Sequence, residues 1–105
     1  MTLVWKAKPD LDPGAEEEFA TIFRALGHKT RLHIVRTVLE RDRCLCGDLA
    51  QELSIAQSTA SQHLRVLEEA GVLSADAEGP RRWYRLRSEP IVRIRSYLAG
   101  LKSIS

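Results

Sequence analysis

The sequence lacks most of the features that build membrane proteins, disulfide-rich domains and enzyme active sites. It contains only two cysteines, too few for a disulfide framework, and no apolar run reaches the length of a signal peptide or membrane helix. It also has no Gly-rich phosphate loop, no nucleophile beside a base and no carboxylate pair in an apolar setting. We therefore expect a cytoplasmic protein that is not an enzyme. Its 105 residues should form one domain with a thin core, which dimerisation would help.

Two parts of the chain carry charge almost entirely of one sign, although the net charge is only +2. Residues 10–18 contain five carboxylates and no Lys or Arg, whereas residues 81–102 contain seven basic side chains and one acid, Glu89. This asymmetry predicts that the C-terminal half lies toward phosphate groups and that the acidic segment points away from them.

The start of the chain is a poor helix former because Pro9, Pro13 and Gly14 interrupt it. We predict an N-terminal arm over residues 1–14, anchored by Trp5, and a single folded domain over residues 15–105.

Residues 49–73 contain two helical patterns that are joined by a short polar turn. The first, over residues 48–53, is too short to be stable without neighbours. The second opens with Ser54 and has Gln57 three residues later, a spacing typical of a capping box at a helix start. We predict that a helix begins there and that the pair forms a helix-turn-helix.

The second helix separates its side chains onto two faces when it is projected at about 100° per residue. One face is aliphatic and should pack on the protein: Ala56, Ala60, Leu64 and Leu67. The opposite face carries amides, hydroxyls and one guanidinium but no carboxylate: Gln57, Ser58, Ser61, Gln62 and Arg65. Glutamine can pair with adenine and arginine can bind guanine or phosphate, so this face suits the DNA major groove. The alternative is an amphipathic helix whose polar surface has no ligand.

A β-hairpin is predicted directly after this helix. Strand-like runs over residues 72–75 and 82–86 flank a turn at residues 78–80. Arg81 and Arg82 lie at its tip, where their charges could reach a DNA phosphate. Alternatively, these arginines only keep an edge strand soluble.

A helix, a turn, a helix and a basic hairpin in this order constitute a winged helix. Over residues 17–98 the chain resembles the ArsR/SmtB family of small bacterial winged-helix repressors, in the stretches LGHKTRLHIVRTVLE, CGDLAQEL, SIAQSTASQHLRVLEEAGVL and EGPRRWYRL. The resemblance implies a mainly α-helical, homodimeric winged helix-turn-helix with a small β-hairpin wing, and a repressor of transcription. Lys29 replaces the proline that often precedes the Thr-Arg pair, a change that a first helical turn tolerates.

Apolar stripes at helical spacing occur near both ends of the chain. One domain of this size cannot easily cover both, so we expect a second copy to do so, and the resemblance likewise implies that the first and last helices form the dimer interface. A twofold dimer would place its two recognition helices about one DNA turn apart on an inverted repeat. The alternative is that both stripes belong to a monomer core. The predicted interface residues are Phe19, Ile22, Phe23, Ile91, Ile94, Leu98 and Leu101.

Cys44 and Cys46 form a Cys-x-Cys pair, for which a metal or redox role is more common than a disulfide in a cytoplasmic protein. Arsenite or a soft metal ion could bridge two such thiolates. Metalloid sensors of the resembled family carry cysteines one and three residues before the Asp-Leu pair, whereas here they lie two and four residues before Asp48. The chain also lacks a third thiolate. Sensing through the thiols and a role as small core residues both remain open.

Three histidines complete the candidate residues. Zinc and nickel sensors of the family use Asp and His on their last helices, but this chain has neither after Arg87, so that site is not expected. His28 and His33 have no ligand partners at metal-binding spacing, which favours structural roles. His63 lies at the edge of the apolar face of the second helix, where the resemblance implies a phosphate contact and packing is the alternative.

We expect a repressor that binds an inverted-repeat operator as a homodimer. The main rival is a winged-helix adaptor that binds protein partners through the same surface. Steep salt dependence of DNA binding would favour the repressor, because each neutralised phosphate releases counterions.

Overall fold

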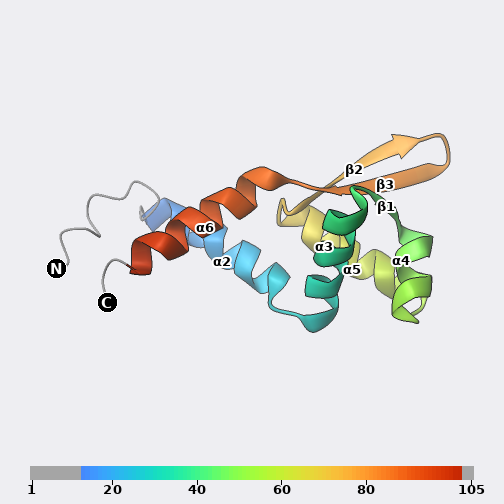
Figure 1. Cartoon of the computed structure of the whole chain (residues 1–105), viewed down its shortest axis with the longest axis horizontal. Helices are drawn as coiled ribbons and strands as arrows, with labels where there is room; N and C mark the ends of the chain where they lie inside the picture. Colours follow the sequence, from blue (N-terminus) through green and yellow to red (C-terminus); the bar gives the residue numbers. More distant parts are fainter. Residues whose placement is uncertain (1–12, 103–105) are drawn as a thin grey trace.

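The computed structural model describes residues 13–102 of the chain (Figure 1). Most of the predicted arm, including Trp5, lies outside the described residues, and the first helix begins at Pro13, within the predicted arm. The elements follow in the order α2 (Pro13–Leu26), α3 (Lys29–Arg41), β1 (Cys44–Leu45), α4 (Cys46–Leu53), α5 (Gln57–Glu69), β2 (Leu73–Glu78), β3 (Arg81–Leu86) and α6 (Ser88–Lys102).

The sheet has three antiparallel strands in the order β1-β3-β2. Strands β2 and β3 form the predicted hairpin and are longer than expected, since they pair from Leu73 opposite Leu86 to Glu78 opposite Arg81. The tight connection contains Gly79, whose φ of 61° is a left-handed value that glycine adopts without steric cost. Strand β1, which places Cys44 opposite Tyr84, was not predicted.

The core forms where α3, α4 and α5 meet the sheet. Leu64 and Leu67 of α5 are completely buried, as are Ile34 and Val38 of α3. Burying one such side chain contributes about 2 kcal/mol. The apolar spacing of each helix therefore determines which face turns inward, and this packing compensates for the shortness of α4.

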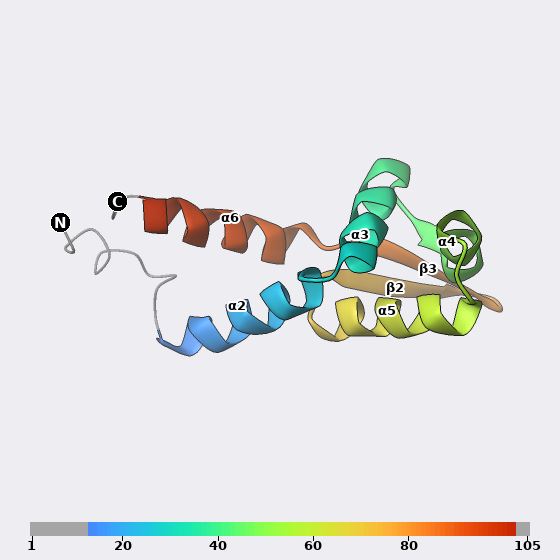
Figure 2. The same cartoon turned by 90° about the horizontal axis from the view of Figure 1, so that it is seen from below.

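Helices α2 and α6 extend away from this core, in the opposite direction from the wing (Figures 1 and 2). The molecule measures 52 × 25 × 22 Å along its principal axes. The two helices contact each other through the rings of Phe19 and Tyr97, whose centroids lie 4.7 Å apart, and through an ion pair between Arg93 and Glu18.

Burial within the single chain changes the set of predicted interface residues. Phe19, Ile22 and Ile94 are buried in the chain's own core. They therefore have no exposed surface with which to contact a second copy, although the sequence analysis placed them in the dimer interface. Ile91 and Leu101 are half-buried. Phe23 is 36% exposed, with its ring centroid 6.4 Å from that of Tyr97, and Leu98 is 49% exposed. Val92, which was not predicted, is also exposed.

None of the helices within residues 13–102 is both long enough and apolar enough to cross a membrane.

Candidate nucleic-acid interface

The turn between α4 and α5 sets the position of the candidate recognition helix. Ser54 adopts a left-handed conformation with φ 56° and ψ 45°, and its backbone N–H donates to carbonyl oxygens of the last turn of α4. Helix α5 begins at Gln57 with Ala56 as its N-cap residue and has no side-chain cap. The predicted capping box of Ser54 and Gln57 is therefore wrong. Ser54 ends α4, and in this position its hydroxyl cannot cap a helix that starts after Ala56.

The C-terminal end of α5 is capped at Gly71. Gly71 has φ 81°. Its N–H donates to the Glu68 carbonyl at 3.0 Å, and the Val72 N–H donates to the Leu67 carbonyl at 2.9 Å. This pair of bonds is the Schellman arrangement, which satisfies carbonyl groups left open by the helix end and directs the chain into β2.

The two faces of α5 are arranged as the sequence predicts. Ala60, Leu64 and Leu67 are buried, but Ala56 is exposed, because as the N-cap residue it precedes the helical turns that pack on the core. His63 is half-buried. The polar residues of the predicted recognition face are all exposed: Gln57, Ser58, Ser61, Gln62 and Arg65.

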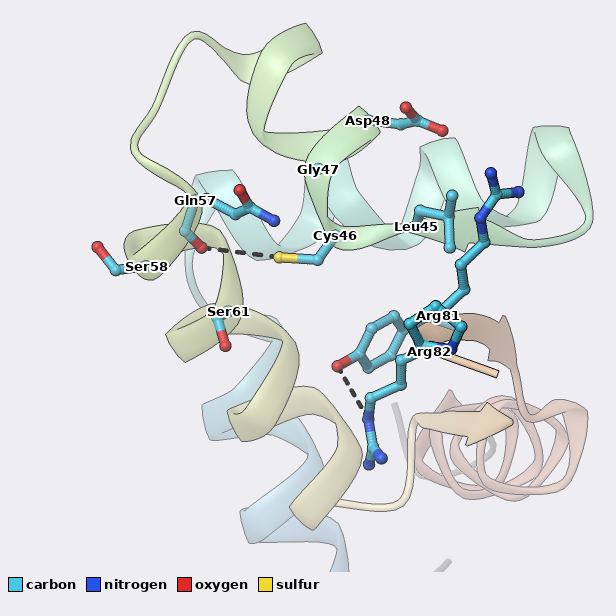
Figure 3. Close-up of a pocket in the computed structure, with 11 residues that line it drawn as sticks. Leu45, Cys46, Gly47, Asp48, Gln57, Ser58, Ser61, Arg81 and Arg82 are labelled. Atoms are coloured by element: carbon cyan, nitrogen blue, oxygen red, sulfur yellow. Dashed lines mark hydrogen bonds between the residues drawn. The ribbon is translucent and has the colours of Figure 1, made fainter. Parts of the chain in front are cut away.

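An open cleft of about 560 Å³ separates the N-terminal half of α5 from the wing (Figure 3). Gln57, Ser58 and Ser61 line it on the helix side, and Arg81 and Arg82 line it on the wing side. The structure therefore brings the polar helix face and the basic wing, which are about 20 residues apart in the sequence, to the edges of one hollow.

The two wing arginines have different surroundings. The Arg82 guanidinium forms an ion pair with Glu68 at 2.8 Å and donates a hydrogen bond to the Tyr84 hydroxyl at 3.2 Å. These bonds, that to Glu68 foremost, raise the pKa of Arg82. Arg81 extends in the opposite direction (Figure 3) and takes part in none of the ion pairs found within residues 13–102. Its charge is therefore available to an anion.

Comparison with known proteins identifies the family. A helix-turn-helix domain model matches residues 26–74. The cadmium resistance transcriptional regulatory protein CadC homolog of Staphylococcus aureus is 34% identical over 87 residues, which cover 82% of this chain and 71% of that protein. A crystallised ArsR family transcriptional regulator matches with a TM-score of 0.77 and 25% identity, covering 85% of this chain and 91% of that one. The chain belongs to the ArsR family of helix-turn-helix transcriptional regulators.

Family membership makes the chain a DNA-binding transcriptional regulator and not an enzyme. The predicted mainly helical winged fold is confirmed. A further structural neighbour is the homodimeric winged helix-turn-helix DNA-binding domain of a Mycobacterium bovis protein described as a possible ArsR-family transcriptional regulator, with a TM-score of 0.70 and 25% identity, covering 92% of this chain and 88% of that one.

The cysteine pair of this ArsR-family chain is divided between two environments. Cys44 lies in β1, is 3% exposed and has its sulfur 4.0 Å from the Thr37 carbonyl oxygen. Cys46 begins α4, lines the cleft and has its sulfur 3.6 Å from the Gln57 carbonyl oxygen. The chain passes from strand to helix between the two cysteines, so their thiols lie in different surroundings.

Burial raises the pKa of both thiols, Cys44 and Cys46, above the ordinary value. Each thiol therefore has a smaller thiolate fraction at neutral pH than an unburied cysteine, and the thiolate is the form that reacts with metal ions and oxidants. Within residues 13–102, no group of three or more His, Cys, Asp or Glu side chains is placed to hold a metal ion.

Two contributors to the site were missed by the sequence interpretation. Glu68 and Tyr84 hold Arg82 against the side of α5. Glu68 lies 14 residues from Arg82, and no local pattern indicates such a contact. Tyr84 does carry a signal, because its alternation along β3 predicts that it lies on the same side of the strand as Arg82.

Proposed function

We propose that this ArsR-family chain binds an inverted-repeat operator as a homodimer and represses transcription from the DNA that it occupies. One observation carries the proposal. The exposed face of α5 has amides, hydroxyls and a guanidinium, and it adjoins a wing arginine that has no ion-pair partner among the described residues. These are the groups that read base edges and neutralise phosphate.

The helix and the wing would divide the work. Gln57 and Gln62 are exposed on α5 and can each form paired hydrogen bonds with a base, which specifies sequence. Arg81 on the wing can bind the phosphate backbone, which adds affinity on any sequence. A protein-interaction adaptor would not require this separation of specific and nonspecific groups.

Dimer formation is supported by the apolar side chains that the single chain leaves exposed on its projecting helices. Phe23 of α2 and both Val92 and Leu98 of α6 are more than a third exposed. A second copy related by a twofold axis could cover them and would present two recognition helices together.

The test is DNA binding by the purified protein to a duplex selected from a random-sequence library, measured at several salt concentrations. Arg81→Ala should weaken binding to all duplexes and lower the salt slope by about one. Gln57→Ala or Gln62→Ala should leave the salt slope unchanged and relax the preference for particular bases by about 1–3 kcal/mol each. Weak binding with no salt dependence would contradict the proposal and favour the adaptor.

A second proposal concerns the signal that releases the operator. The Cys46 sulfur contacts the carbonyl of Gln57, the first residue of α5, so a group attached to Cys46 would displace the start of the recognition helix. Arsenite, a soft metal ion or an oxidant could act in this way. Because both recognition helices must fit their half-sites together, such a shift would weaken operator binding by about 1–3 kcal/mol.

Titration of the operator complex with arsenite, cadmium ion and peroxide tests this proposal. Release should occur in the wild type and disappear in Cys46→Ser. Cys44→Ser distinguishes the two thiols, because a buried core thiol should not be needed for release. Equal operator affinity with and without every reagent would mean that the cysteines sense nothing and that Cys44 serves only in the core.

A further inference from the structure

The C-terminal ends of α2 and α5 border a second hollow, which is separate from the cleft beside the wing (Figure 2). Its volume is about 280 Å³, close to the lower end of the range of about 300–1,000 Å³ that small-molecule sites occupy. Arg31 of α3 lines one side. Each of the other two elements contributes residues spaced three and four apart, which lie side by side on a helix. They are Thr21, Arg24 and Ala25 at the end of α2, and Val66, Glu69 and Ala70 at the end of α5.

Small and apolar side chains leave this space open. Ala25 and Ala70 line the hollow where α2 and α5 approach each other, and a methyl group fills less of such a gap than a longer side chain. Val66 is 37% exposed, so part of its apolar surface faces solvent at the hollow. A concave surface that is apolar, with a few polar groups at its edge, is typical of sites for small molecules.

The charged residues that line the hollow do not neutralise one another. They are Arg24, Arg31 and Glu69, which together carry one excess positive charge. None of the ion pairs within residues 13–102 includes any of the three. The hollow therefore complements a ligand with one negative charge, whereas the Glu69 carboxylate opposes a second negative charge.

The two arginines differ in how firmly they are held. Arg31 donates from Nε to the Ala25 carbonyl at 2.6 Å and from Nη2 to the Arg24 carbonyl at 3.3 Å, so it is fixed to the end of α2 and contributes its charge from there. The Arg24 guanidinium donates to the Thr21 hydroxyl at 3.4 Å, which is long for a hydrogen bond. A carboxylate forms shorter, charge-assisted bonds with a guanidinium, so Arg24 is the group that can turn to a ligand.

We propose that this hollow binds a small organic molecule with one carboxylate and an apolar body. Arg24 pairs with the carboxylate, and Ala25, Val66 and Ala70 contact the apolar part. Such a ligand touches α5, the proposed recognition helix, and also α2, which carries Phe23 of the proposed dimer surface. Ligand and DNA would then change each other's affinity by the same factor. This regulatory consequence rests on the proposed DNA-binding function, whereas binding of the carboxylate does not.

An NMR titration of the 15N-labelled protein with sodium benzoate tests the site. The backbone amide signals of residues 21–25 and 66–70 should shift, with a dissociation constant on the order of 1 mM for so small a ligand. Benzyl alcohol has the same ring without the charge, and phthalate has a second carboxylate. Each should bind at least about threefold more weakly, because the alcohol forms no charge-assisted bond with Arg24 and Glu69 repels the second charge of phthalate.

Arg24→Gln should weaken benzoate binding at least about tenfold, because it removes a hydrogen-bond donor that carries charge. Arg95→Gln is the matched control, since Arg95 is exposed on α6 and lies outside the hollow, and it should bind benzoate like the wild type. The site is refuted if the two variants lose affinity equally, or if benzoate shifts other amides and not these. Shifts of these amides on dilution of the protein, without any from benzoate, would assign the hollow to a second copy and also overturn the proposal.

The regulatory consequence is tested with the duplex selected from the random-sequence library. Replacing chloride by benzoate at constant ionic strength should change the DNA affinity of the wild type at least about threefold. Arg24→Gln should have the wild-type DNA affinity in chloride and should not respond to benzoate. Benzoate binding without any change in DNA affinity would refute the coupling. Failure of the wild type to bind DNA in either salt would refute the proposed function itself and leave the result of the NMR titration unaffected.

Discussion

Arg81 and Arg82 show how adjacent residues of one type can differ in what they are able to do. Both are exposed at the wing, but the Arg82 charge is already paired with Glu68 and hydrogen-bonded to Tyr84. A phosphate that recruits Arg82 must compete with this carboxylate, whereas Arg81 can bind at once. Ion pairs between exposed side chains are weak in water, so Glu68 moderates Arg82 without removing it from use.

We predict that Glu68→Gln strengthens DNA binding and that this gain requires Arg82. Removing the carboxylate frees the guanidinium and deletes a negative charge near the DNA, which should tighten binding about two- to fivefold at low salt. In an Arg82→Ala background the same change should have a smaller effect. Fluorescence anisotropy with duplex DNA measures both, and an equal gain in the two backgrounds would show that the gain does not come from freeing Arg82.

The helices and the wing could be predicted from the sequence because their signals are local. Spacing of three and four residues places Leu64 and Leu67 on the buried face of α5, and Gly71 marks its end. Long-range features could not be predicted. The pairing of Cys44 with Tyr84 and the burial of Phe19 against Tyr97 depend on how distant segments meet.

The turn between α4 and α5 shows two local signals in competition. Ser54 and Gln57 have capping-box spacing, yet a short connection between two crossing helices requires a residue in the left-handed conformation, and Ser54 takes that place. A hydrogen bond from a serine cap is worth about 1 kcal/mol. The packing of α4 against α5 involves several buried side chains and therefore determines the outcome.

Substitution at Ser54 should reveal this backbone requirement. Ser54→Val should lower the free energy of unfolding by about 1–2 kcal/mol, because a β-branched side chain is disfavoured at positive φ. Ser54→Gly should be neutral or slightly stabilising. Urea denaturation measures both. Ser58→Val, an exposed change in the first turn of α5, serves as the control and should cost less than about 0.7 kcal/mol. A similar cost for both valine variants would contradict the assigned role of the turn.

The shape of the whole molecule favours a second copy. Helices α2 and α6 project away from the helix-turn-helix and the wing (Figure 2), and their shared core consists of few side chains, with Phe19 and Tyr97 at its centre. Leu98 and Val92 remain about half exposed on α6. An apolar surface on a thin projection is costly in water, and a twofold dimer would cover it while linking two recognition helices.

We predict that Leu98→Arg produces a folded monomer, because a charge in an apolar interface must be desolvated without a partner. Leu39→Arg is the matched control, since Leu39 is 63% exposed but lies on α3, away from the projecting helices. Sedimentation should give the wild type and Leu39→Arg about twice the chain mass of 11.8 kDa, and Leu98→Arg the chain mass itself. Leu98→Arg should also lose at least about 100-fold in operator affinity, because its two half-sites are no longer bound together. If Leu98→Arg remains a dimer and Leu39→Arg does not, then α3 and not α6 forms the interface.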